Sequence, residues 1–317
     1  MRLGLGCAQL GNLYRAMSDE TATEIVDTAW AHGVRYFDTA PHYGLGLSER
    51  RLGAALANRP RDEYLLSTKV GRLLVDNPGG AAERDTEGFD VPATLVRRRD
   101  YSRDGVLRSL ESSLDRLGVD RVDIAYVHDP EDHVDEALTG ALPALVELRE
   151  QGVLRGIGLG MNLDDVLADF VRRADVDVVM IAGRYTLLEQ PALDELLPLC
   201  AERGVDVMAA GVFNSGILAS ATPGHTYNYA EAPAGLVERA TRIAEVCASH
   251  GVTLPEAAVA LPAAHPAVAA VVLGASSPAQ VESNAARAAA RVPAALWADL
   301  VAEGLLRADT PLPEEVA

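Results

Sequence analysis

Cysteine is scarce in this 317-residue chain, which has only Cys7, Cys200 and Cys247, far apart and without a CxxC pair. An odd number at such spacings indicates neither a disulfide framework nor a zinc site, so we expect three buried thiols. No apolar run reaches the roughly 20 residues that a membrane-spanning helix needs. The first residues begin a strand pattern without a signal-peptide core, so we expect a cytoplasmic protein with no membrane partner.

Positive charge is also in short supply, because 28 Lys and Arg residues stand against 46 Asp and Glu residues, for a net charge of −18 at pH 7. Nucleic-acid binding requires a basic surface, so this balance argues against a nucleic-acid partner. The one basic cluster, Arg97 to Arg99, is expected to be solvated in a long loop. Hydrophobic residues make up 49% of the chain, which suffices for a large core.

The chain alternates between short apolar runs typical of buried strands and amphipathic stretches typical of helices. Strands are expected at 2–7, 34–38, 65–71, 124–128, 154–160, 176–182, 206–210 and 268–274. Eight strands that are each followed by helix predict an α/β fold, a single (β/α)8 TIM barrel over residues 1–317 with a flexible tail at 309–317. We expect long loops at 71–102 and 212–234, over the C-terminal mouth, to shape a substrate site.

Polar side chains stand at the ends of three successive predicted strands: Asp38, with Tyr43 on the following turn, Lys69 and His128. In a parallel barrel these ends converge on one face. A phenol has a pKa of about 10, too high for easy proton loss at neutral pH, but a nearby ammonium favours the phenolate. Asp38 would keep that ammonium charged, and His128 could donate to a substrate oxygen or relay its proton. The four groups therefore suit hydride transfer with a tyrosine as proton carrier.

Each of these residues also has an ordinary structural role. The carboxylate and the ammonium could form a buried ion pair, Tyr43 could simply pack, and His128 could be a core histidine. His128 and His133 are five residues apart without a matching carboxylate, so we expect no metal. Asp129 could orient His128 or cap a turn, and both roles remain open.

In order and type, Asp38, Tyr43, Lys69 and His128 resemble the catalytic tetrad of the aldo-keto reductase superfamily. The resemblance to this superfamily extends over about residues 3 to 290 of the chain. Shorter stretches are similar to one branch, the bacterial D-threo-aldose 1-dehydrogenases or L-fucose dehydrogenases, with which pyridoxal 4-dehydrogenases are grouped. These stretches are Gly11–Tyr14, Lys69–Leu74, Asp100–Gly105, His128–His133, Arg184–Leu188 and Phe213–Gly216. The resemblance implies oxidation of the anomeric carbon of an aldose such as L-fucose or D-arabinose to a lactone, with Tyr43 as general acid/base.

The resemblance also implies a nicotinamide cofactor across the barrel mouth, although no GxGxxG motif follows the first strand. It places Asn162 and Arg184 at the carboxamide and Phe213 against the nicotinamide ring, although Arg184 stands where glutamine is common. Further cofactor contacts are implied for Asn214, Ser215 and Gly216 at the pyrophosphate and for Gly274, Ser276, Ser277, Gln280 and Asn284 around the adenosine. Ser276 stands where NADP-dependent members often have arginine, and a hydroxyl cannot hold a 2′-phosphate as a guanidinium does. This favours NAD over NADP.

The same groups acting in reverse would reduce a carbonyl. Alternatives are therefore an NADPH-dependent aldehyde or ketone reductase, a pyridoxal dehydrogenase, or a cofactor-sensing regulatory protein, against which the complete tetrad argues. We expect a small-molecule sugar or aldehyde as partner, and the resemblance allows a monomer or a small homo-oligomer.

Overall fold

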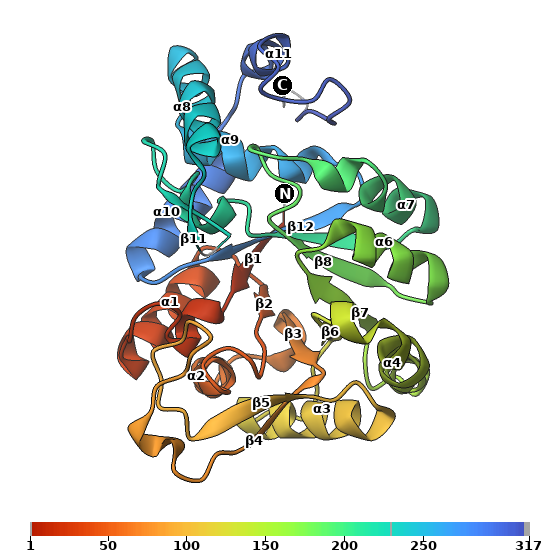
Figure 1. Cartoon of the computed structure of the whole chain (residues 1–317). Helices are drawn as coiled ribbons and strands as arrows, with labels where there is room; N and C mark the ends of the chain where they lie inside the picture. The colour runs from red at the N-terminus through yellow and green to blue at the C-terminus, as the bar shows by residue number, and fades with distance from the viewer. Residues whose placement is uncertain (1, 229, 314–317) are drawn as a thin grey trace.

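Eight parallel strands close into a barrel surrounded by helices in the computed structural model, which describes residues 2–228 and 230–313 (Figure 1). The barrel strands are, in spatial order, β1 (Leu3–Gly6), β2 (Tyr36–Asp38), β3 (Leu65–Val70), β6 (Ile124–His128), β7 (Gly156–Met161), β8 (Val178–Ala182), β9 (Asp206–Ala210) and β12 (Val268–Gly274). Each strand pairs with the next along the chain, and β12 closes on β1 from Leu3 opposite Val271 to Gly6 opposite Gly274. The predicted (β/α)8 fold is confirmed.

Helices follow the strands, as predicted, and cover the outside of the barrel. They are α1 (Asp19–Ala31), α2 (Leu47–Leu56), α3 (Arg103–Leu117), α4 (Val134–Glu136), α5 (Leu142–Glu150), α6 (Asp164–Arg173), α7 (Leu196–Arg203), α8 (Ala234–Ser249), α9 (Leu254–Ala260), α10 (Pro278–Ala289) and α11 (Ala294–Ala302). Local signals set these bounds: Ser18 caps α1 by accepting from the Thr21 N–H, and Gly118 ends α3 in a left-handed conformation.

The inside of the barrel is filled by alternate residues of its strands, because successive side chains of a strand point to opposite faces. This apolar cluster consists of Tyr36, Ile124, Tyr126, Val178, Met180, Met208, Ala270 and Val272. The outward side chains of the same strands, such as Phe37 and Val179, are fully buried under the helices. Strands covered on both sides hold the polar groups at their ends in fixed positions.

The long connection predicted at 71–102 is present, and its two ends pair as an antiparallel hairpin beside α3 (Figure 1). Its strands β4 (Arg72–Asp76) and β5 (Leu95–Arg99) pair from Arg72 opposite Arg99 to Asp76 opposite Leu95. The prediction of a solvated basic cluster is wrong for Arg97, whose side chain is 5% exposed and pairs with Asp85, itself 6% exposed. A buried guanidinium requires such a partner.

The second predicted loop, 212–234, likewise contains local structure. It has a 3-10 turn at Asn214–Gly216 and a small hairpin of β10 (Thr226–Tyr227) and β11 (Ala230–Glu231). The three cysteines are buried and unpaired, as predicted. Residues 314–317 of the predicted tail lie outside the described residues, and Thr310 within it is buried. No helix among the described residues has both the length and the apolar character needed to cross a bilayer.

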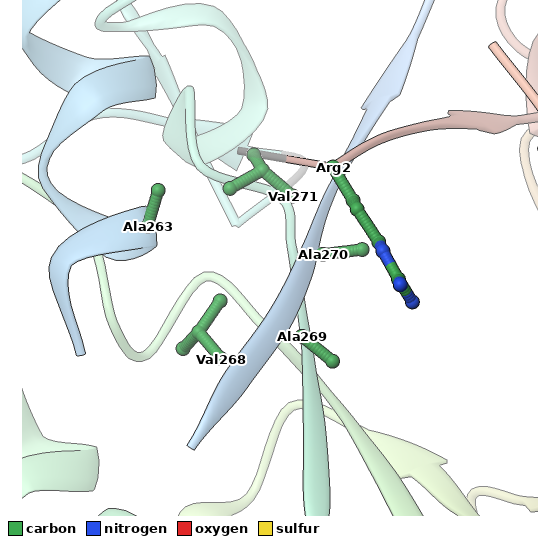
Figure 2. Close-up of a pocket in the computed structure, with 6 residues that line it drawn as sticks. All are labelled: Arg2, Ala263, Val268, Ala269, Ala270 and Val271. Atoms are coloured by element: carbon green, nitrogen blue, oxygen red, sulfur yellow. The ribbon is translucent and has the colours of Figure 1, made fainter. Parts of the chain in front are cut away.

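A cavity of about 300 Å³ opens where β12 begins, at the N-terminal end of the barrel. It is lined by Arg2, Ala263 and the first residues of β12, and Figure 2 shows the long Arg2 side chain beside Ala269 and Ala270. The predicted catalytic residues stand at the C-terminal ends of the strands. This cavity is therefore at the opposite end of the barrel from them.

Candidate active site

The four predicted catalytic side chains lie together at the C-terminal mouth. The Lys69 ammonium donates to Asp38 Oδ2 at 2.5 Å, to Tyr43 Oη at 3.0 Å and to the Thr39 carbonyl oxygen at 3.1 Å. The His128 ring stands edge-on to the Tyr43 ring, with centroids 6.1 Å apart. The carboxylate and the ammonium are each about 2% exposed, so their charges are almost fully removed from water.

The turn that presents Tyr43 is fixed by a close backbone contact. β2 ends at Asp38, and Gly44 takes a left-handed conformation with φ of 63° right after the tyrosine. A Cβ on Gly44 would lie 2.2 Å from the Gly11 carbonyl oxygen, so no larger residue fits without displacing the first βα loop. The turn therefore sets the phenol against Lys69.

Asp38 has a second support that sequence reasoning missed. Ser67 donates from Oγ to Asp38 Oδ1 at 2.7 Å, so both carboxylate oxygens accept hydrogen bonds. Ser67 Oγ also lies 3.0 Å from Tyr36 Oη, which is 3.1 Å from Tyr126 Oη inside the barrel. The signal was present, since Ser67 precedes Lys69 by two residues on one strand and shares its inward face.

Two pKa shifts fix the charge states of the site. Burial opposes the Lys69 ammonium, but the Asp38 carboxylate and Tyr43 outweigh it and raise the pKa of Lys69 above its usual value. Burial lowers the pKa of His128 well below its usual value, and the nearby Arg72 and Lys69 cations lower it further. At neutral pH the lysine is therefore charged and the histidine is neutral.

The β4–β5 hairpin brings further charged groups to the tetrad, and the sequence alone gave no signal for them. The Arg72 guanidinium pairs with the Asp129 carboxylate, and its Nη1 lies 3.2 Å from His42 Nδ1 and 3.4 Å from Glu87 Oε2. Asp129 Oδ2 is 3.5 Å from His128 Nε2. Of the two roles considered for Asp129, this geometry favours orientation of His128.

The base of the hairpin also holds the backbone after β6. Tyr101, which follows β5 and is fully buried, donates from Oη to the carbonyl oxygens of His128 and Asp129, at 2.7 Å each. Asp129 itself has a φ of 44°. Gly71 makes room for this arrangement, because a Cβ there would lie 2.2 Å from the Tyr101 ring.

Asn162 and Arg184, implied for the carboxamide, lie on the loops after β7 and β8, and Asn214, implied for the pyrophosphate, follows β9. Arg184 donates from Nε to the Asn162 carbonyl oxygen at 2.9 Å and from Nη1 to Glu189 at 3.0 Å. Asn214 is buried, and its side-chain amide donates to the Gly183 carbonyl oxygen at 3.1 Å and to Glu189 at 3.2 Å.

The 3-10 turn after β9 is internally bonded as well. The backbone amides of Asn214 and Gly216 donate to the carbonyl oxygens of Gly211 and Phe213, while Ser215 has φ of 59°. A pyrophosphate bound by these amides would have to compete with those bonds. Their role, and that of the half-buried Phe213 ring, stays a prediction.

The residues implied for the adenosine form the turn between β12 and α10. Ser277 caps α10 by accepting from the Gln280 N–H, and Gln280 Oε1 accepts from the N–H and the hydroxyl of Ser276. Asn284 donates to the Gly274 carbonyl oxygen at 3.2 Å. Sequence reasoning missed Arg15, whose Nη2 donates to Ser276 Oγ at 2.9 Å and brings a guanidinium to this turn.

A phenol, an ammonium, a carboxylate and a neutral imidazole lie together at the mouth of a parallel barrel, the arrangement expected of a barrel oxidoreductase. A sequence profile described as the Aldo/keto reductase family matches residues 2–302, and the chain belongs to that family. It is therefore an NAD(P)-dependent oxidoreductase.

Three proteins are similar to this chain over nearly its whole length. The chain is 49% identical to a D-threo-aldose 1-dehydrogenase of Pseudomonas sp over 313 residues, which cover 96% of this chain and 94% of that protein. It is 39% identical to a pyridoxal 4-dehydrogenase of Microbacterium luteolum, with the same coverage. Among solved structures, the holo form of aldo-keto reductase AKR11C1 from Bacillus halodurans matches with a TM-score of 0.74 and 27% identity, over 99% of this chain and 94% of that one.

Proposed function

We propose that this enzyme oxidises the anomeric carbon of an aldose such as L-fucose or D-arabinose to a lactone, with NAD or NADP as hydride acceptor. The observation that carries the chemistry is the position of the Lys69 ammonium, 2.5 Å from Asp38 Oδ2 and 3.0 Å from Tyr43 Oη. The name of the relative at 49% identity supports the aldose. A cyclic aldose already carries a hydroxyl on the reacting carbon, so no water has to add first.

The residues around the mouth fit a nicotinamide cofactor by their chemistry. An exposed Asn162 amide suits a carboxamide, and the exposed guanidinium of Arg15 suits a phosphate. When bound, the cofactor supplies the acceptor for the hydride of the anomeric carbon. The NAD preference inferred from Ser276 stays a prediction, because Arg15 restores a cation at that turn.

Proton transfer is assigned to Tyr43. Lys69 donates to its phenolic oxygen and stabilises the phenolate, which takes the proton of the anomeric hydroxyl. Asp38, held by Ser67, keeps Lys69 charged and in place. The neutral His128 donates a hydrogen bond to the same substrate oxygen and so orients it.

A second candidate is the oxidation of pyridoxal, which the relative at 39% identity favours. Reduction of an aldehyde or ketone by NADPH uses the same groups in the reverse direction. An assay of the protein with NAD⁺ or NADP⁺ and L-fucose, D-arabinose or pyridoxal, followed by absorbance of the reduced cofactor, separates these reactions. Faster loss of reduced cofactor with carbonyl substrates would point to the reductase.

The proton carrier is tested by Tyr43→Phe. We expect kcat to fall by about 10²- to 10⁴-fold, the usual contribution of a general acid or base, with cofactor binding unchanged. Tyr64→Phe is the matched control, since this buried ring packs edge-on against Phe37 under β2, away from the mouth. Unchanged turnover in Tyr43→Phe would refute the assignment of Tyr43.

A further inference from the structure

Beside His128 lies the carboxylate of Asp129, whose position favours orientation of the imidazole but which has no contact with the substrate in the reaction as proposed. The Asp129 carboxylate is held through Oδ2, which accepts from Arg72 Nη2 and lies 3.5 Å from His128 Nε2. Part of this carboxylate remains open to a ligand. The Asp129 side chain is 25% exposed, whereas those of Lys69 and His128 are 2% and 8% exposed.

Two buried nitrogens of the same group lack hydrogen bonds. Arg72 Nε and His128 Nδ1 are both closed off from solvent and have no partner among the described residues. Buried polar groups in native proteins are nearly always paired, so these two atoms show that the polar bonding around Asp129 is incomplete. The Asp129 carboxylate is the member of the group that a ligand can reach. The polar groups gathered here are the carboxylate of Asp129, the guanidinium of Arg72 and the imidazole of His128.

Their spacing suits two neighbouring hydroxyls. Oxygens on adjacent carbons of a sugar ring lie about one hydrogen-bond length apart. If the reacting hydroxyl lies between Tyr43 and His128, a hydroxyl on the next carbon falls within reach of the carboxylate that is 3.5 Å from His128 Nε2. Burial raises the pKa of Asp129, and the Arg72 guanidinium opposes this rise. The same guanidinium fixes the orientation of the carboxylate, which can accept a hydrogen bond from a hydroxyl.

We propose, on the basis of the proposed function, that Asp129, held by Arg72, recognises the hydroxyl on the carbon next to the one that is oxidised. The enzyme therefore selects sugars with a free 2-hydroxyl. A 2-deoxy sugar lacks this group and leaves the carboxylate without that hydrogen bond, and so does pyridoxal, whose reacting carbon is attached to an aromatic ring carbon without a hydroxyl.

D-Arabinose and 2-deoxy-D-ribose form a matched pair of substrates, because they differ only in the 2-hydroxyl. We expect kcat/KM of the wild-type enzyme to favour D-arabinose by about 10- to 100-fold, the value of one hydrogen bond to a charged group. In Asp129→Asn this preference should shrink at least about tenfold, mostly through loss of activity on D-arabinose. The ratio is internal to each variant, so partial loss of folded protein does not affect it.

Two further variants complete the test. Asp132→Asn is the control, because Asp132 lies in the same segment but is 78% exposed and pairs with Arg99. It should keep the wild-type preference. Arg72→Lys keeps the charge but loses the planar fork, so its preference should fall between those of the wild type and Asp129→Asn.

The outcomes separate this inference from the function on which it rests. Equal kcat/KM for the two sugars in the wild type, or an unchanged preference in Asp129→Asn, overturns the role of Asp129 while the aldose oxidation stands. No turnover of either sugar, with turnover of pyridoxal, overturns the proposed function itself.

Discussion

Lys69 is the only lysine in the chain, since the 28 basic residues comprise 27 arginines and this one ammonium. Its three protons match its three acceptors, Asp38 Oδ2, Tyr43 Oη and the Thr39 carbonyl oxygen. A planar guanidinium with five donors would be too wide for this arrangement and would leave donors unpaired. The compact ammonium of Lys69 therefore suits this position better than a guanidinium would.

Arg15 bears on whether the proposed adenosine site prefers NADP⁺ or NAD⁺. Its guanidinium bonds to Ser276 Oγ, at the position where the sequence lacks the arginine that is common in NADP-dependent relatives. Arg15→Ala should weaken NADP⁺ binding about tenfold or more and leave NAD⁺ binding unchanged, because only NADP⁺ carries a 2′-phosphate. Titration with each cofactor by intrinsic fluorescence, at one fixed ionic strength, measures both affinities.

Arg242→Ala provides the control for charge alone, since Arg242 is 51% exposed and pairs with Glu303 on the outer helices. A loss that is equal for NAD⁺ and NADP⁺ in Arg15→Ala would place this guanidinium at a part that the two cofactors share. No loss for either cofactor would remove Arg15 from the site.

At the scale of elements, the barrel was predictable because its strands appear in the sequence as short apolar runs. The run 268–274 is apolar on both faces, as is 206–210 after its exposed Asp206, and the two form β12 and β9 with the predicted bounds. The polar ends of β2, β3 and β6 stood out against such runs, so the tetrad could be placed before any contact was known. Short local patterns sufficed for both.

The β4–β5 hairpin was not predictable in the same way. β5 reads Leu95-Val-Arg-Arg-Arg99, and its buried cation, Arg97, is paired by Asp85 across the hairpin loop, so no apolar alternation marks the strand. The contacts of Arg15 and Arg72 could not be predicted from the sequence for a related reason. Each joins segments far apart in the sequence, and no local pattern encodes such a pair.

The hairpin is expected to act on catalysis through its base. Tyr101→Phe removes the hydroxyl that donates to the carbonyl oxygens of His128 and Asp129 and leaves these acceptors short of a donor. We expect a loss of about 1–3 kcal/mol in the free energy of unfolding. Because His128 is then less well placed, kcat should fall more than KM changes. Urea denaturation and steady-state kinetics measure the two effects.

Tyr185→Phe is a matched control for this loss, because Tyr185 is also fully buried but its hydroxyl has no partner among the described residues. Its removal should be neutral or slightly stabilising. Equal effects of the two substitutions would show that the Tyr101 hydroxyl bonds contribute nothing beyond burial.

The molecule as a whole is acidic, and three of its cations lie near one another at the mouth of the barrel. Lys69, Arg72 and Arg97 gather there, each paired with one aspartate of the same region, within a chain of net charge −18. This arrangement penalises any further positive charge. Burial, followed by Arg72 and Arg97, lowers the pKa of His42 from its usual 6.5 to about 2.

This shift makes the stability of the protein depend on pH. A histidine whose pKa is lowered on folding contributes stability that is present above its unfolded pKa and is lost as pH falls towards the folded value. The unfolded chain takes up a proton at His42 below pH 6.5, while the folded chain does not until about pH 2. Below pH 6.5 each such histidine should therefore steepen the fall in the free energy of unfolding, by up to roughly 1.4 kcal/mol per pH unit.

His42→Gln should remove one such contribution. Urea denaturation at steps between pH 7.5 and 5 gives the slope of the free energy of unfolding against pH. In the variant this slope should be smaller by up to roughly 1.4 kcal/mol per pH unit, the contribution of one proton. A wild-type slope in His42→Gln would mean that folding does not hold this imidazole neutral, and that the cations at the mouth do not act on it as their positions require.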